Sequence, residues 1–253
     1  MPKIADDSPL RQHPVDLSEK QILLLDGIRF SADMASIAHD RLWRKLGDIE
    51  AKGEKATTFD IAEAMLDAWS IVDAAHRIYD AIESFPGLPK KSIWRKLAER
   101  RLSEANSFRN AWQHLTDNET LEATVDLRGQ VWGAVGWFSH SKRRWFVAIA
   151  GSSLRDSQHL FIGLHHMIPR VDARRIRLFH GGAEFYLSRA VNDIFEAVAG
   201  LEDDLRQGRV SLRGDKIDRQ RESDMIYEGY LEVLVAAPDA NVQSPQIGES
   251  SKR

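Results

Sequence analysis

The chain contains no cysteine among its 253 residues, which excludes disulfide bonds, thiolate metal ligands and cysteine nucleophiles. It also lacks an apolar run of the roughly eighteen residues that a membrane-spanning helix requires. The N-terminal segment, MPKIADDSPLRQHPVD, is polar and has no apolar stretch of the kind found in secretory signal peptides. We therefore expect a cytoplasmic protein that does not bind a membrane.

Several common site signatures are also missing: there is no Walker-type phosphate loop, no Rossmann glycine fingerprint and no nucleophile elbow. The formal net charge of -3 and the pI near 6.3 give no overall attraction for nucleic acid. Any contact with RNA must therefore be local, for example at the basic clusters around 142–144 and 170–177. A solvated surface explains such clusters equally well.

The chain does contain enough apolar residues, 43% of the total, to bury a core. Its length suits one domain with an elaboration, or two small domains. The pattern predicts a flexible leader over 1–16, a helical bundle formed by 17–118 and 183–236, a β-rich insertion at 119–182 and a disordered tail at 237–253.

Three helices are predicted in the first half, at 17–50, at 57–84 and after Pro89, with Ser18 and Ser92 as candidate caps. The apolar residues that give the first its period are Ile22, Leu25, Ile28, Phe30, Met34, Ile37, Leu42 and Leu46. The third is expected to direct these residues toward a core: Ile93, Leu97, Ala105, Phe108, Trp112 and Leu115.

A β-hairpin is predicted from the Val-, Trp- and Phe-rich segments 130–138 and 144–150, with further short strands at 159–164 and 175–179. Helical periodicity returns at 183–206 and again at 217–235. The fold class expected is α+β, mainly α, with a small antiparallel sheet inserted between the third and fourth long helices.

The run SFRNAWQHLTDNE holds the most informative group of polar residues, Arg109, Asn110 and His114. A guanidinium that holds a phosphate and an imidazole that moves protons near neutral pH are the minimum for cleaving RNA without a metal ion. Spacing alone is weak, because Arg175 precedes His180 at the same interval. An Asn directly after the Arg, late in an amphipathic helix, makes the pattern more specific.

This run resembles the HEPN superfamily, whose members carry an Arg–polar–x(3–5)–His motif near the end of a helix in a small bundle. The matching positions are Arg109, Asn110 and His114, and the resemblance leaves the insertion at 119–182 unexplained. It implies a metal-independent endoribonuclease of a toxin–antitoxin or phage-defence system, needing no cofactor. It also implies a homodimer that pools two motifs, and it allows an antitoxin or another protein partner.

If this activity carries over, Arg109 holds the scissile phosphate and offsets charge on its oxygens. His114 then moves a proton at the ribose 2′-oxygen or the leaving 5′-oxygen, and Asn110 orients the imidazole or a phosphate oxygen. Attack of the 2′-hydroxyl gives a 2′,3′-cyclic phosphate and a 5′-hydroxyl end.

Helix geometry limits this arrangement. Arg109 and His114 lie about 140° apart on a regular helix, whereas Asn110 and His114 share a face. One alternative is a His that bonds the last carbonyls of its helix beside an Arg in a surface ion pair. A non-catalytic HEPN-like module that binds RNA or a protein partner is a second alternative, and an unrelated helical scaffold with a chance motif is a third.

A second polar set, Asp73, His76, Arg77 and Asp80, follows i, i+3, i+4, i+7 spacing in the second predicted helix. If this row faces the third helix, Asp73 or Asp80 can hold Arg109 and His76 can join the site. Otherwise it is a solvated row with an Asp73–Arg77 pair. We expect no metal site, since adjacent histidines such as those at 165–166 point to opposite faces of a strand.

Overall fold

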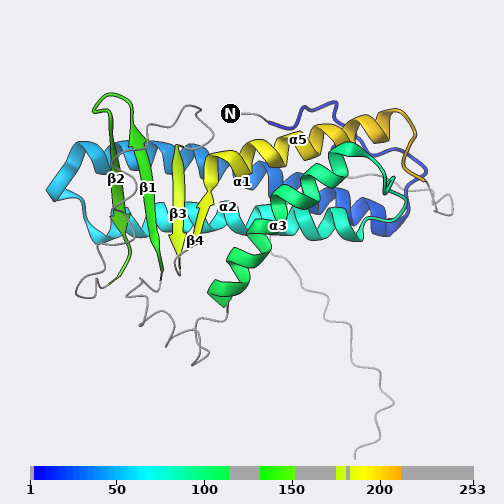
Figure 1. The fold of residues 1–253 in the computed structure, drawn as a ribbon. Helices are drawn as coiled ribbons and strands as arrows, with labels where there is room; N and C mark the ends of the chain where they lie inside the picture. The colour runs from blue at the N-terminus through cyan, green and yellow to red at the C-terminus, as the bar shows by residue number, and fades with distance from the viewer. Residues whose placement is uncertain (1–2, 114–131, 152–174, 181–182, 212–253) are drawn as a thin grey trace, which may run out of the picture. The chain divides into compact units, whose positions relative to one another are not determined.

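Two long helices, α1 and α2, form the centre of the structure (Figure 1). The computed structural model describes residues 3–113, 132–151, 175–180 and 183–211. Helix α1 spans Glu19–Lys52 and α2 spans Thr58–Ser84, and the short 3-10 helix η1, Gly53–Lys55, lies between them. Because this connection is so short, the two helices pack side by side along their length.

Both long helices begin with a reciprocal capping box. Ser18 accepts from the backbone of Gln21, whose side chain bonds the Ser18 backbone, and Thr57 and Asp60 repeat the pattern at α2. Such a cap contributes about 1 kcal/mol to helix stability. A hydrogen bond from Lys52, 2.6 Å from Asp60 Oδ1, and further bonds from Thr57 lower the pKa of the Asp60 carboxyl.

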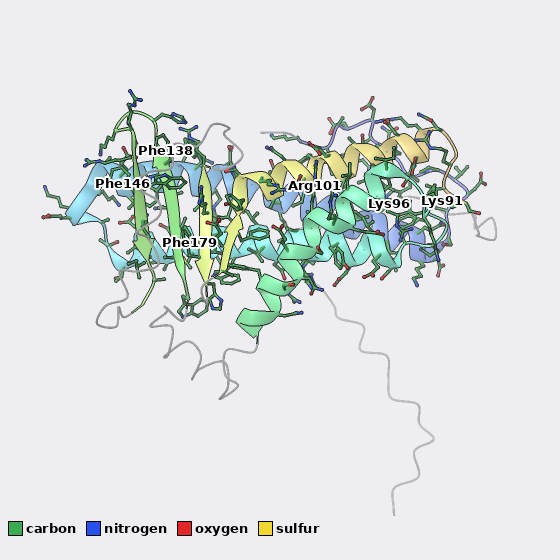
Figure 2. The ribbon with its side chains drawn as sticks, in the orientation of Figure 1. Lys91, Lys96, Arg101, Phe138, Phe146 and Phe179 are labelled. Carbon is green, nitrogen blue, oxygen red and sulfur yellow. The ribbon has the colours of Figure 1, made fainter. Side chains whose placement is uncertain are left out.

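Helices α3, Ile93–Gln113, and α5, Leu187–Arg206, complete the helical layer. Helix α3 packs on α2 and α5, and α5 packs on all three other helices. Arg101 of α3, labelled in Figure 2, bonds Asp193 of α5 at 2.9 Å and also pairs with Glu196. The apolar face of α5 is buried, as its periodicity predicts: Leu187, Ala190, Val191, Ile194, Val198 and Leu201.

Four antiparallel strands form one sheet in the order β2-β1-β3-β4. They are β1 Ala134–Ser139, β2 Arg144–Ile149, β3 Ile176–His180 and β4 Ala183–Tyr186. The sheet lies across the end of the α1–α2 pair near η1 (Figure 1). This confirms the predicted class, a mainly helical α+β fold with a small antiparallel sheet inserted before the last described helix.

The sheet has two faces, as alternation along a strand requires. Residues such as Val135, Leu178 and Phe185 join the main core with the helices. On the other face, Phe138, Trp145 and Phe179 form a separate small cluster, and Figure 2 labels two of them. The inward face therefore makes the sheet continuous with the helical core.

One carboxylate of α1 fastens the β-hairpin to the helices. Glu50 accepts hydrogen bonds from the Ser139 hydroxyl at 2.9 Å and from the Trp137 indole at 3.4 Å. Lys142, in the hairpin turn, lies 3.4 Å from the same carboxylate. The end of α1 thus fixes where the hairpin sits.

The structure changes several details of the prediction. Residues 183–186 form β4 rather than the start of a helix, because Phe185 is buried opposite Leu178 and Glu184 pairs with Arg177 at 3.0 Å. Part of the expected flexible leader packs on the bundle, with Leu10 fully buried and Ser8 bonded to Glu202.

The prediction for the core face of α3 also differs in part. Ile93 is exposed, and Ala98 and Leu102 join Ala105 and Phe108 in the core instead. On α1, three residues of the predicted period lie on the outer surface: Phe30, Met34 and Ile37. The strand at 159–164, the helix at 217–235 and the tail at 237–253 lie outside the described residues.

Residues 1–218 group into one compact unit, in which the sheet and the helices share a core. Within the part of the chain that the structure describes, no helix is long and apolar enough to cross a membrane.

The close contact between α3 and α5 depends on Gly200. A Cβ at this position would lie 2.5 Å from the ring of Trp94, whose indole donates to Asp204 at 2.8 Å. We expect Gly200→Ala to lower the free energy of unfolding by about 1–3 kcal/mol, because the indole must move. Gly47→Ala is the control: its Cβ meets nothing within 4 Å, so it should stabilise by about 0.5–1 kcal/mol. Urea unfolding measures both, and equal stabilisation by the two would contradict the Trp94 contact.

A partly buried histidine joins α1 to α5. His39 Nε2 lies 3.0 Å from the Ser188 hydroxyl, and burial lowers the pKa of His39 to about 4. The unfolded chain, with an ordinary value near 6.5, binds this proton more readily between those two pH values. Folding stability therefore falls as the pH drops through this window.

We expect this loss to reach about 3 kcal/mol at pH 4 and to disappear in His39→Gln. Urea unfolding at a series of pH values measures it, with the exposed His140→Gln as the control. An unchanged pH dependence in His39→Gln would show that His39 is not its source.

Candidate functional site

The polar row on α2 faces α3. Asp73, His76, Arg77 and Asp80 recur at the spacing of one helix face, and Arg109 of α3 reaches the same place. Arg109 Nε donates to Asp73 Oδ1 at 3.0 Å, and its Nη1 lies 2.8 Å from His76 Nε2. The structure therefore brings these five side chains together across the α2–α3 contact.

His76 is the buried member of the group. Its ring is 8% exposed, and its Nε2 lies near both Arg109 Nη1 and, at 3.2 Å, Asp80 Oδ2. A guanidinium only donates, so the bond from Arg109 requires a lone pair on Nε2 and places the ring proton on Nδ1. Among the described residues, His76 Nδ1 has no hydrogen-bond partner. A second proton on the ring would redirect Nε2 from Arg109 to Asp80.

The formal charges of the group balance. Asp73 pairs with Arg77 at 2.6 Å as well as with Arg109, and Asp80 supplies the second carboxylate. The contacts of Arg109 to Asp73 and His76 use two of the five N–H donors of a guanidinium. Arg109 is thus held from α2 in a fixed orientation, with donor capacity beyond these two contacts. A bound phosphate would need an additional positive charge, from a proton on His76 or from another subunit.

Of the other two motif residues, Asn110 and His114, the structure describes only Asn110. Asn110 is exposed and follows Arg109 on α3. His114 lies outside the described residues, one position beyond the last residue of α3 that the structure describes. The geometry therefore shows the Arg109 half of the motif and its α2 partners.

Aromatic side chains of α2 and the sheet hold Phe108, the residue before Arg109. Phe108 packs against Trp69 of α2 and Phe185 of β4, with ring centroids 5.5 Å away in both cases. His180 of β3 meets the edges of Trp69 and Phe108 at 5.6 and 6.0 Å. Arg109 thus follows a residue that is clamped between the sheet and α2.

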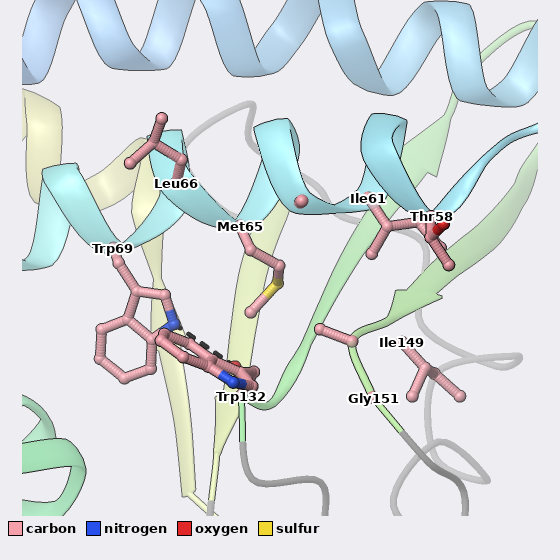
Figure 3. Close-up of a pocket in the computed structure, with 10 residues that line it drawn as sticks. Thr58, Ile61, Met65, Leu66, Trp69, Trp132, Ile149 and Gly151 are labelled. Carbon is pink, nitrogen blue, oxygen red and sulfur yellow. Dashed lines mark hydrogen bonds between the residues drawn. The ribbon is translucent and has the colours of Figure 1, made fainter.

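An apolar pocket, which the sequence did not point to, opens beside this clamp (Figure 3). Its volume is about 740 Å³, within the range of small-molecule sites. The Trp69 indole donates to the Trp132 carbonyl at 3.3 Å at one side. The lining residues come from α2 and from the two ends of the β-hairpin: Thr58, Ile61, Ala62, Met65, Leu66, Trp69, Trp132, Ile149, Ala150 and Gly151.

A signal for the pocket is present on α2, where apolar residues occur on more than the one face that packs in the core. Phe59 and Leu66 are exposed while Met65 and Ile71 are buried, so this helix has more apolar surface than its packing uses. Which part of that surface forms a pocket depends on where Trp132 and Gly151 lie, and this follows from strand pairing rather than local sequence.

No family model, no curated protein and no solved structure matches this chain. Within the described ranges, no group of three histidine and acidic side chains is arranged to hold a metal ion. What this site can do is therefore inferred from its geometry alone.

The Asp73–Arg109 contact should show measurable coupling. Both groups are about two-thirds buried, and a double-mutant cycle with Asp73→Asn and Arg109→Gln should give a coupling free energy of about 1 kcal/mol in urea unfolding. The same cycle with the exposed Arg77→Gln should give only a few tenths, because solvent screens that pair. Coupling energies in the opposite order would contradict the role of Asp73 as the holder of Arg109.

Proposed function

We propose that this protein is a HEPN-like, metal-independent endoribonuclease. The observation that supports the proposal is the holding of Arg109 by Asp73 and His76 beside the exposed Asn110. A guanidinium that is fixed before substrate arrives loses less conformational entropy on binding a phosphate, and it stabilises developing charge without reorganisation.

In this proposal Arg109 binds the scissile phosphate and His114 moves a proton between the ribose and the leaving group. The 2′-oxygen forms a new bond to phosphorus as the bond to the 5′-oxygen breaks, which gives a 2′,3′-cyclic phosphate and a 5′-hydroxyl. Asn110 orients His114 or a phosphate oxygen. Asp73 is a positioning residue that sets the direction of Arg109.

The role of His76 follows from its two partners. With Nε2 accepting from Arg109, the imidazole keeps the guanidinium in place. With both nitrogens protonated, it pairs with Asp80 and adds the positive charge that a phosphate in this neutral group requires. Phosphate binding and protonation of His76 are therefore expected to favour each other.

This chemistry suits a cytoplasmic toxin or phage-defence effector that acts as a homodimer and is regulated by an antitoxin or another protein.

One observation favours a second function, a non-catalytic module that binds RNA or a protein partner. The Arg109 group is formally neutral, and its two arginines both pair within the chain. A surface ion-pair network with this composition also serves to fasten α3 to α2.

The first function predicts cleavage of single-stranded or transfer RNA in the presence of EDTA. His114→Ala and Arg109→Ala should each reduce the rate by about 10²–10⁴-fold, with circular dichroism unchanged. Arg100→Ala, an exposed arginine on the same helix, is the matched control and should cleave like the unmodified protein. Product analysis should show 2′,3′-cyclic phosphate ends.

Asp73→Asn tests the positioning role. We expect slower cleavage with a raised KM, because Arg109 loses the anion that aims it, and partial rescue by Asp73→Glu. Intact RNA after incubation with unmodified protein would refute catalysis. Retained RNA binding in that case would favour the non-catalytic module.

A further inference from the structure

Helix α1 carries an apolar stripe on its outer surface. Leu23, Phe30, Met34 and Ile37 are 51% to 71% exposed, and Gly27 continues the row between the first two. These five positions, the α1 stripe, alternate steps of four and three residues. This is the spacing of a seam along which two helices pack. The opposite side of α1 is already buried against α2 and α5.

Gly27 is a second observation on the same face. A Cβ at this position meets nothing within 4 Å among the residues that the structure describes. Glycine within a helix costs about 1 kcal/mol relative to alanine, and no close neighbour among the described residues of the subunit requires glycine at this position. Small residues in a helix face allow another helix to approach closely.

The charges that flank the stripe match an antiparallel copy of the same helix. Glu19 and Arg41 lie equally far from Phe30 along α1, in opposite directions. An antiparallel pair centred at Phe30 places Glu19 near Arg41 of the other subunit, and Arg41 also lies 3.4 Å from Asp67 in its own chain. A parallel pair places like charges together, which is unfavourable.

The same arrangement matches the side-chain sizes. With Phe30 at the twofold axis, Leu23 lies opposite Ile37, and Gly27 lies within one residue of the level of Met34, so the smallest member of the stripe is next to a long one. A twofold interface uses the same patch on both subunits, and the α1 stripe is complementary to itself in shape and in charge.

We propose that two copies of this protein associate through the α1 stripe in an antiparallel α1–α1 dimer. The interface lies on α1, whereas the Arg109 group lies between α2 and α3, so the proposal is independent of ribonuclease activity. The partner that covers the α1 stripe is thus a second copy of this chain.

Sedimentation equilibrium of the full-length protein over a wide concentration range tests the association. We expect a reversible monomer–dimer equilibrium, and Met34→Glu should weaken it by at least about 10-fold, since a buried unpaired charge costs more than 1.4 kcal/mol. Phe59→Glu is the matched control, because Phe59 is an even more exposed apolar residue on α2. If the unmodified protein is monomeric over the whole concentration range, the proposal is overturned. In that case another part of the chain or another protein covers the stripe.

Crosslinking tests the orientation, since the chain has no cysteine of its own. A short bismaleimide should join Leu23→Cys protein to Ile37→Cys protein when the two are mixed, and should join neither to itself. Phe30→Cys, at the axis, should crosslink to itself. Efficient self-crosslinking of Leu23→Cys would show a parallel pair and overturn the antiparallel arrangement. When Met34→Glu is combined with each cysteine substitution in the same chain, the crosslinks should be lost, which confirms that they arise from this interface.

Discussion

The packing of α1 against α2 is the contact on which the rest of the structure depends. Both helices are capped by reciprocal hydrogen bonds and joined by five residues that include η1, so they pair locally before any distant segment is required. The sheet covers one end of the pair, and α3 and α5 cover the remainder. The Arg109 group and the apolar pocket both use residues of α2, and the α1 stripe lies on the surface of α1 that this packing leaves outside.

The Arg109 group combines two roles that usually belong to different residues of a protein. Its members form an ion-pair network that fastens α3 to α2, which is a structural role, and they hold a guanidinium beside a buried imidazole, which is the feature on which the proposed ribonuclease function rests. In the proposed ribonuclease the same side chains would serve both roles, because a guanidinium has N–H donors beyond the contacts of Arg109 to Asp73 and His76.

The sequence predicted the features that depend on local pattern. Apolar steps of three and four located the long helices, Ser18 marked a cap, and the row Asp73–Asp80 indicated which side chains of α2 share a face. It could not tell that Phe30 and Ile37 point outward, because a helix with apolar residues on two sides has the same period whichever side is buried. Residues 183–186 were missed as a strand because their only reason to extend is the partner strand β3. The function that the motif implies stays a prediction.

The direct passage of β4 into α5 has a mechanical consequence. Leu187 begins the helix immediately after Tyr186 ends the strand, so no loop absorbs movement between them. Phe185 of that strand presses on Phe108, the residue before Arg109. The sheet and α3 therefore share an aromatic contact one residue from Arg109, so the place of the guanidinium depends on where β4 lies.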